Sequence, residues 1–222
     1  MDQNKVRDFW RMVEDAAGTL CAVLDTSSSD RGLQQGIWRI GRLVQKLRSA
    51  AADIDPLLTV EVDQIPAGDA TVLRIAVSCN HDPEGIEAVQ DLVAAAPPMP
   101  PRIQACAFVQ PIPKEMAHGF GTIEIHGREV RLHQVRFLAE PSTIAPGTFD
   151  MVCFVPTSAL TEMDPQDVPG ALVANVVLSM GIGELRSMTR VRSIGIAMTD
   201  RPPPDAVNAW DVNEIMDSAP VH

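Results

Sequence analysis

Apolar side chains recur every three or four residues in two stretches near the start of the chain, residues 4–24 and 31–52, which predicts two amphipathic helices. In the second stretch the apolar positions form one narrow stripe, which consists of Leu33, Ile37, Ile40, Val44, Leu47 and Ala51. The opposite side is basic and carries Arg31, Arg39, Arg42 and Lys46. The segment DTSSSD between the two stretches supplies turn and N-cap residues. We therefore expect a helical pair at the N-terminus.

From residue 58 onward, apolar and polar residues alternate, as in half-buried strands. Two alternating runs, one around Val60 and one around Ile75, flank the segment PAGD and predict two strands joined by a short turn. A helical pattern follows over residues 83–96 and ends at APPMPP, because proline has no backbone N–H to continue a helix. Residues 102–110 alternate again and predict a third strand.

The segment TIEIHGREVRLH, residues 122–133, predicts a β-hairpin. A two-residue loop at Gly127-Arg128 would place its apolar side chains on one face, with Ile125 opposite Val130. The same register would place Glu124 opposite Arg131 on the other face.

The remaining pattern predicts a strand, a helix and a last strand, over residues 149–155, 166–181 and 190–199. Strand–helix–strand connections favour parallel pairing, whereas short hairpins require antiparallel neighbours. We therefore expect an α+β fold in which the N-terminal helical pair precedes a mixed β-sheet, with the helices mainly on one face and two successive strand–helix–strand units. The expected boundaries are one domain over residues 1–200, with a helical portion 1–55 and a sheet-containing portion 56–200, followed by a C-terminal tail 201–222.

The composition narrows the classes of function. A net charge of −11 and the absence of tyrosine, with aromatic residues at only 4%, argue against a nucleic-acid partner, which needs basic contacts and stacking surfaces. No apolar run approaches the ~18–20 residues that cross a bilayer, and the N-terminus has no apolar leader pattern. We expect a cytoplasmic protein with no membrane partner. No phosphate-binding glycine motif or C-x-x-C pair is present, so we expect no cofactor.

The segment VSCNHDPEG, residues 77–85, gathers Cys79, His81 and Asp82 at the junction of a strand and a helix. A structural interpretation accounts for each of its polar residues. Asp82 suits an N-cap, Pro83 suits the first helical position, and Glu84 favours the positive end of the helix dipole.

Two chemical interpretations of the same segment compete with this structural one. A nucleophilic Cys79 near a helix N-terminus could use His81 as its base, although the nearby carboxylates disfavour a thiolate. Metal binding by Cys79, His81 and Asp82 fits no standard ligand set, because a soft thiolate would stand beside a hard carboxylate. We therefore expect no metal site.

Charge is segregated along the chain. The second helix is basic, whereas residues 137–185 contain no Lys or Arg and carry six acidic residues. Such a division is typical either of an interface or of two solvated faces. The interface interpretation makes Arg31, Arg39, Arg42 and Lys46 candidate contacts for a protein partner or for a second copy.

The segment LRIAVSCNHDPEGIEAVQDLVAAAPPMPPRIQACAFVQP, residues 73–111, resembles one shared by a group of uncharacterised bacterial proteins, in which a strand and a helix ending in LVxxAP precede another strand. The matching residues are Ser78, Leu92, Val93, Ala96, Pro97, Ala107, Phe108 and Pro111. Residues 171–196 are similar to the closing helix–Gly-Glu–strand segment of that group. The group typically has an aromatic residue where this chain has Pro101-Arg102. The resemblance implies an architecture and no activity, since none is established for the group.

These observations support two hypotheses for the function. The first is a non-catalytic module that binds a protein partner or assembles with itself, because no complete catalytic or cofactor-binding motif is present and charge is segregated. The alternative is an enzyme or small-ligand-binding protein with a pocket around residues 78–84, in which Cys79, His81 and Asp82 would carry the chemistry.

Overall fold

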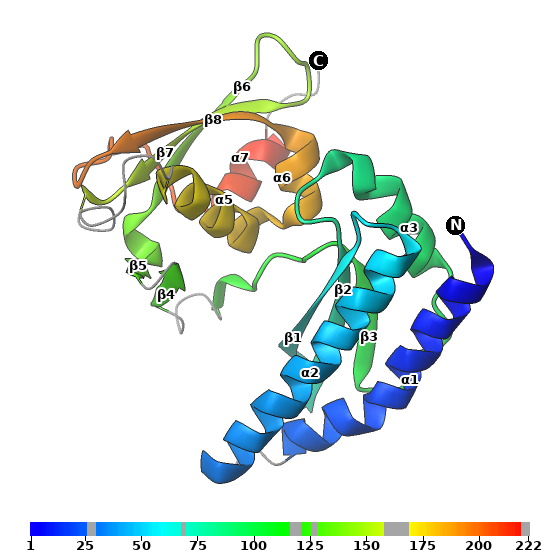
Figure 1. Cartoon of the computed structure of the whole chain (residues 1–222). Helices are drawn as coiled ribbons and strands as arrows, with labels where there is room; N and C mark the ends of the chain where they lie inside the picture. The colour runs from blue at the N-terminus through cyan, green and yellow to red at the C-terminus, as the bar shows by residue number, and fades with distance from the viewer. Residues whose placement is uncertain (26–29, 68–69, 116–120, 126–127, 158–168, 219–222) are drawn as a thin grey trace. The chain divides into compact units, whose positions relative to one another are not determined.

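The structure is a computed structural model of the chain, and it describes all residues except 26–29, 68–69, 116–120, 126–127, 158–168 and 219–222. The chain divides into two compact units, Met1–Val109 and Gln110–His222, called unit 1 and unit 2 below. Each unit combines helices with a three-stranded sheet (Figure 1). The predicted α+β class and the N-terminal helical pair are therefore confirmed. The prediction of one domain over residues 1–200 stays a prediction, because compactness alone does not show which parts fold independently.

Unit 1 begins with the two predicted helices and continues into a sheet with strand order β1-β2-β3. Strand β2 pairs antiparallel with β1 and parallel with β3, and α3 makes the crossover between β2 and β3. The elements are α1 (Gln3–Asp25), α2 (Asp30–Ile54), β1 (Thr59–Ala67), β2 (Ala70–Ser78), the 3₁₀ helix η1 (Pro83–Gly85), α3 (Ile86–Ala94) and β3 (Ile103–Ala107).

The two faces of the unit 1 sheet differ because successive side chains along a strand point to opposite sides. One face is apolar and includes the fully buried Val60, Ile75 and Val77. The other face carries Arg74, whose guanidinium forms an ion pair with Asp63 on the neighbouring strand at 2.5 Å. The helices add their own buried apolar side chains, and the Nε1 of Trp10 in α1 donates to the carbonyl of Leu92 in α3 at 2.9 Å.

Unit 2 contains a two-stranded hairpin and a second three-stranded sheet, of strand order β6-β7-β8. Strand β7 pairs antiparallel with β6 and parallel with β8, so this sheet repeats the pairing pattern of unit 1. The elements are β4 (Thr122–Ile125), β5 (Arg128–Arg131), η2 (Leu132–Gln134), β6 (Arg136–Pro141), β7 (Phe149–Val155), α5 (Pro169–Ile182), α6 (Glu184–Arg190), β8 (Val191–Met198) and α7 (Val212–Ser218).

The core of unit 2 lies on one side of its sheet, called the inner face. Phe137, Met151 and Cys153 point to this side, where they pack with buried residues of α5 and α7. The alternate residues form the outer face and lie outside that core cluster: Arg136, Leu138 and Glu140 in β6, Asp150, Val152 and Phe154 in β7, and Ser193, Gly195 and Ala197 in β8. The helices of the described core thus cover one face of the sheet.

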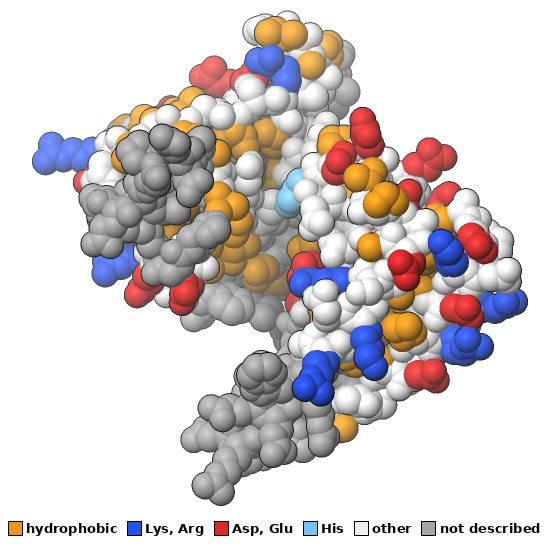
Figure 2. Space-filling model, viewed as in Figure 1, with side chains coloured by type: hydrophobic (Ala, Val, Ile, Leu, Met, Phe, Trp, Pro, Cys, Tyr) orange, Lys and Arg blue, Asp and Glu red, His pale blue; other side chains and the backbone are white. Residues whose placement is uncertain are grey.

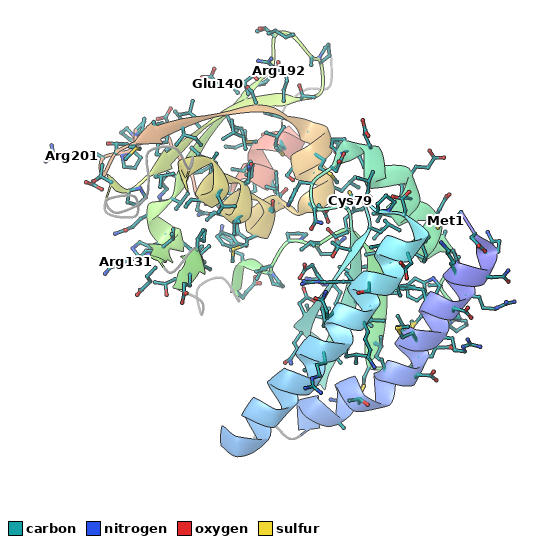
Figure 3. All side chains as sticks on the ribbon, viewed as in Figure 1. Met1, Cys79, Arg131, Glu140, Arg192 and Arg201 are labelled. Carbon is teal, nitrogen blue, oxygen red and sulfur yellow. The ribbon has the colours of Figure 1, made fainter. Side chains whose placement is uncertain are left out.

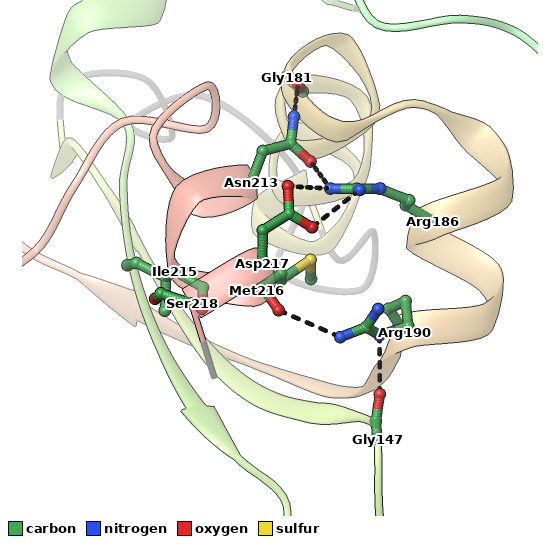
Figure 4. A network of polar contacts seen from close by, with 9 residues as sticks. All are labelled: Gly147, Gly181, Arg186, Arg190, Asn213, Ile215, Met216, Asp217 and Ser218. Carbon is green, nitrogen blue, oxygen red and sulfur yellow. Dashed lines mark hydrogen bonds and ion pairs between the residues drawn. The ribbon is translucent and has the colours of Figure 1, made fainter. Parts of the chain in front are cut away.

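Part of the predicted C-terminal tail is an integral part of unit 2. Val212 and Met216 of α7 are buried in its core. A polar network also joins α7 to α6, where Arg186 binds Asn213 at 2.7 Å and Asp217 at 2.9 Å (Figure 4). Arg190 donates to the carbonyls of Gly147 at 2.7 Å and Met216 at 3.2 Å. These contacts fix residues 212–218 in place.

Most of the predicted elements are present, but three details differ. The sequence pattern did not predict β6, and the strands form two mixed sheets and a hairpin instead of a single sheet. The predicted hairpin register is wrong: Ile125 pairs with Arg128, and Glu124 lies opposite Glu129 instead of Arg131. The register moves by two residues because Leu132 is buried in the 3₁₀ helix η2 and not in the strand.

No single helix among the described residues is long and apolar enough to cross a bilayer. Helices α5 and α6 reach that length and apolarity only together, and they meet at an angle of 111°.

Replacing Gly181 by alanine tests how closely α5 packs on the segment before α7. A Cβ atom at Gly181 would lie 2.4 Å from the carbonyl carbon of Ala209, so the backbone would have to move. We expect Gly181→Ala to lower the free energy of unfolding by about 2 kcal/mol, measured by urea denaturation. Gly18→Ala in α1 is the matched control, because a Cβ atom there meets nothing within 4 Å and alanine favours the helix. Equal stability of the two variants would contradict this packing.

Candidate functional site

The predicted segment around Cys79 forms a tight turn between β2 and η1. Asn80 and His81 both have positive φ angles, of 52° and 63°, and the backbone N–H of Asp82 donates to the carbonyl of Cys79 at 3.0 Å. Two central residues with positive φ closed by this hydrogen bond are typical of a type I′ turn. The turn buries Cys79 completely, whereas His81 is exposed.

Cys79 and Asp82 both have structural roles in this turn. A Cβ atom at Gly85 would lie 2.5 Å from the Cβ of Cys79, so the thiol side chain packs directly against the glycine backbone. The Oδ1 atom of Asp82 accepts a hydrogen bond from the backbone N–H of Glu84 at 3.0 Å, and Pro83 occupies the first helical position. The predicted N-cap is therefore confirmed. The catalytic role considered for Cys79, His81 and Asp82 stays a hypothesis.

The cysteines of the described chain are all free thiols. Burial raises the pKa of Cys106 to about 11 and that of Cys153 to about 12. A higher pKa means a smaller thiolate fraction near neutral pH, so neither thiol is an activated nucleophile. Within the described ranges, no three side chains of His, Cys, Asp or Glu come together as metal ligands would.

The basic side of α2 is described only in part. Arg42 and Lys46 are exposed, and basic side chains lie along this helix (Figure 2). The side chains of Arg31 and Arg39 lie outside the described residues. Arg48, further along the helix, binds Glu61 of β1 at 2.7 Å. Arg42 and Lys46 therefore remain available on the surface of unit 1.

Two cavities in unit 2 provide a concave site that the sequence analysis did not predict. The first has a volume of about 300 Å³ and the second about 360 Å³, and His133 and Arg136 line both. Lys114, Gly121, Leu132, Asn208 and Trp210 complete the first cavity, whereas Gln134, Pro156, Thr199, Asp200 and Pro202 complete the second. The short η2 helix and the start of β6 thus bring two basic side chains to the boundary between the cavities.

The wall of the first cavity is held by hydrogen bonds within unit 2. The Nε1 of Trp210 donates to the carbonyl of Ile112 at 2.7 Å, and Lys114 forms an ion pair with Asp211. The hydrogen bond to Asp211 raises the pKa of Lys114, which favours its charged form. No side-chain hydrogen bond or ion pair joins Arg136 to another described residue.

The outer face of the unit 2 sheet is the second notable surface. Its centre is apolar: Leu138 pairs in register with Val152, whose exposed fraction is 38%, and Val152 pairs with Gly195. A Cβ atom at Gly195 would meet only one atom within 4 Å, the carbonyl oxygen of Met151 at 3.7 Å. The surface beside Val152 is therefore open at this glycine.

Charged residues border this apolar centre at both ends. At one end Glu140 lies opposite Asp150, which forms an ion pair with Arg192 at 2.6 Å. Glu140 and Arg192 are labelled in Figure 3. The hydroxyl of Ser193 and the guanidinium of Arg192 hold the pKa of Asp150 below its usual value. At the other end, Arg136 lies beside Phe154. The outer face thus runs from an acidic end to a basic end across an apolar middle.

Comparisons with models of protein families, with curated proteins and with solved structures find no match to this chain.

The sequence contained one signal for the outer face. Apart from Asp150, strand β7, FDMVCFV, is apolar on both sides, whereas a strand with one solvated face alternates between apolar and polar residues. No comparable signal marked the cavities, because their lining residues come from segments as far apart as Lys114 and Trp210.

Substitutions at Asp82 separate its capping role from a chemical one. We expect Asp82→Ala to lower the free energy of unfolding by about 1 kcal/mol, because the N–H of Glu84 loses its acceptor. Asp82→Ser should retain most of the stability, since a serine hydroxyl is also a good N-cap. Thermal and urea unfolding of the three proteins would measure this difference. Equal destabilisation by alanine and serine would show that the carboxylate does something other than cap the helix.

Proposed function

We propose that this protein is a non-catalytic module that binds a protein partner or assembles with itself, and that the outer face of the unit 2 sheet is its binding surface. The single observation that carries the proposal is Val152, an apolar side chain 38% exposed at the centre of the outer face of β7. The proposal places the protein in the bacterial cytoplasm, in the uncharacterised group that residues 73–111 resemble.

The composition of the outer face fits a protein interface better than a solvated sheet. Antiparallel and mixed sheets with one solvated face normally carry polar residues there, whereas Leu138 and Val152 occupy the centre of this one. Interfaces typically combine an apolar centre with a polar rim, and Arg136 and Glu140 provide that rim. Covering this surface would remove apolar area from water, which is the main driving force of association.

The structural roles of the candidate catalytic residues support the non-catalytic part of the proposal. Cys79 is packed against Gly85, and Asp82 caps η1, so both side chains are accounted for by the fold. The exposed Arg42 and Lys46 of α2 form a second surface, which the proposal assigns to an acidic region of the same partner.

A photo-reactive residue at Val152 tests the proposed surface. We expect benzoylphenylalanine at this position to form a covalent adduct of one discrete mass in cells that produce the protein, because the outer face is covered in its complex. Leu172 on α5 is the matched control, since its exposed fraction of 37% is close to the 38% of Val152. Peptide mass analysis would identify the second chain and the linked residue. Equal labelling at both positions, or no adduct at Val152, would contradict the proposal.

The cavities favour a second candidate function, the binding of a small anion. Lys114, His133 and Arg136 line them in a chain whose net charge is −11, so this cluster of basic residues stands out from the rest of the chain. A guanidinium without a protein partner can bind a carboxylate or phosphate through two parallel hydrogen bonds. The volume of about 300 Å³ lies at the lower end of the range for small-molecule sites.

Calorimetric titration with inorganic phosphate and with benzoate tests this second function. We expect Lys114→Ala to weaken the binding of the better ligand about tenfold, which corresponds to one lost charged contact. Glu140→Ala should leave the affinity unchanged, because Glu140 does not line either cavity. The absence of binding to the natural protein at millimolar concentrations of both anions would exclude this function.

A further inference from the structure

We infer that the partner of the outer face is a second copy of this chain, packed sheet against sheet about a twofold axis that passes close to Leu138. The inference rests on the proposed function and names the partner of that surface. The order of charges along β6 and the apolar centre beside it both favour a second copy as this partner.

The sequence of β6 makes its outer face self-complementary. Alternate residues of a strand share a face, so Arg136, Leu138 and Glu140 point to the same side in the order basic, apolar, acidic. A twofold axis at the middle residue reverses this order in the second copy. Arg136 of one copy then faces the second copy's Glu140, and the second copy's Arg136 faces Glu140. Both ion pairs form at once, as an isologous interface requires.

Each end of the strand has a charge that no ion pair with another described residue of unit 2 balances. At the acidic end, Glu140 lies directly opposite Asp150, and such like-charged cross-strand pairs are unfavourable. Arg192 forms its ion pair with Asp150 and not with Glu140. At the basic end, no ion pair joins Arg136 to another described residue. The guanidinium supplied by a second copy would compensate the carboxylate of Glu140.

The middle of the face provides the apolar contact between the copies. Leu138 and Val152 are register partners, and Gly195 leaves room on the other side of Val152. Two sheets that pack face to face interdigitate their side chains at a separation of about 10 Å. The open space at Gly195 can therefore receive an apolar side chain of the second copy. The charged pairs would lie about 13 Å apart, since four residues of strand separate Arg136 from Glu140.

Mixing two charge-reversed variants tests this arrangement directly. Arg136→Glu leaves two acidic groups on β6 of the outer face, whereas Glu140→Arg leaves two basic ones. Two molecules of the same variant would therefore meet with like charges at both contacts and repel each other. We expect each single variant to raise the dimer Kd about 100-fold, roughly tenfold for each like-charged contact. A mixture of the two variants restores both opposite-charge pairs and should form a heterodimer with close to the natural affinity. Native mass spectrometry, with one variant labelled with ¹⁵N, measures each species.

Arg131→Glu is the control for a charge reversal that lies outside the outer face. This side chain is exposed on the hairpin strand β5, and we expect its variant to dimerise like the natural protein. Circular dichroism of all variants checks that they are folded, which excludes misfolding as the cause of a lost dimer.

Two results would overturn the inference. One is a natural protein that is monomeric at about 100 µM, and the other is a mixture of the two variants that gives no heterodimer. Neither result alone overturns the proposed function, because an adduct between Val152 and a different, identified protein would retain the outer face as a binding surface. Absence of both the heterodimer and any adduct at Val152 would remove the inference and the proposed function together.

Discussion

Both units depend on the same constraint, which is that two parallel neighbouring strands cannot be joined by a tight turn. The chain must cross the sheet between β2 and β3, and again between β7 and β8, and in each case a helical segment makes the crossing. In unit 2 the crossing helix α5 buries its apolar side chains on the inner face, where they pack with those of the strands and of α7. The opposite face is left without a helix from the described core, and this is where an apolar strand meets the surface.

The sequence predicted the elements whose pattern matches a single period. Helices α1 and α2 and strands β1, β2 and β3 were recognised because each has one apolar face. Strand β6 was not predicted, because Phe137 points inward and its neighbour Leu138 points outward, so the strand shows no alternation. The hairpin register was wrong for another reason. A shift of two residues keeps the same side chains on the same face, so alternation alone cannot separate the two registers.

In the candidate sites, too, only features formed by residues close together in the sequence could be predicted. The cap formed by Asp82 could be predicted, because its acceptor and donor are two residues apart in the chain. The cavities could not be predicted, since Lys114 and Trp210 meet only after the strands between them have paired. The self-complementary order of charges on β6 lies within five residues, yet it has meaning only once the strand assigns them to one face.

Each unit contains its own tryptophan with a fixed environment, and this gives the molecule two internal fluorescent reporters. Trp10 is only 2% exposed and its indole N–H binds a carbonyl of unit 1, whereas Trp210 is partly exposed and binds a carbonyl of unit 2. The emission of a buried indole is blue-shifted relative to that of a partly hydrated one. The chain has a third tryptophan, Trp38, whose emission would overlap with these two signals. In a variant with Trp38 replaced by phenylalanine, the emission of Trp10 would report on unit 1 and that of Trp210 on unit 2. Whether they change at the same denaturant concentration would show whether the chain unfolds as one cooperative domain or as two.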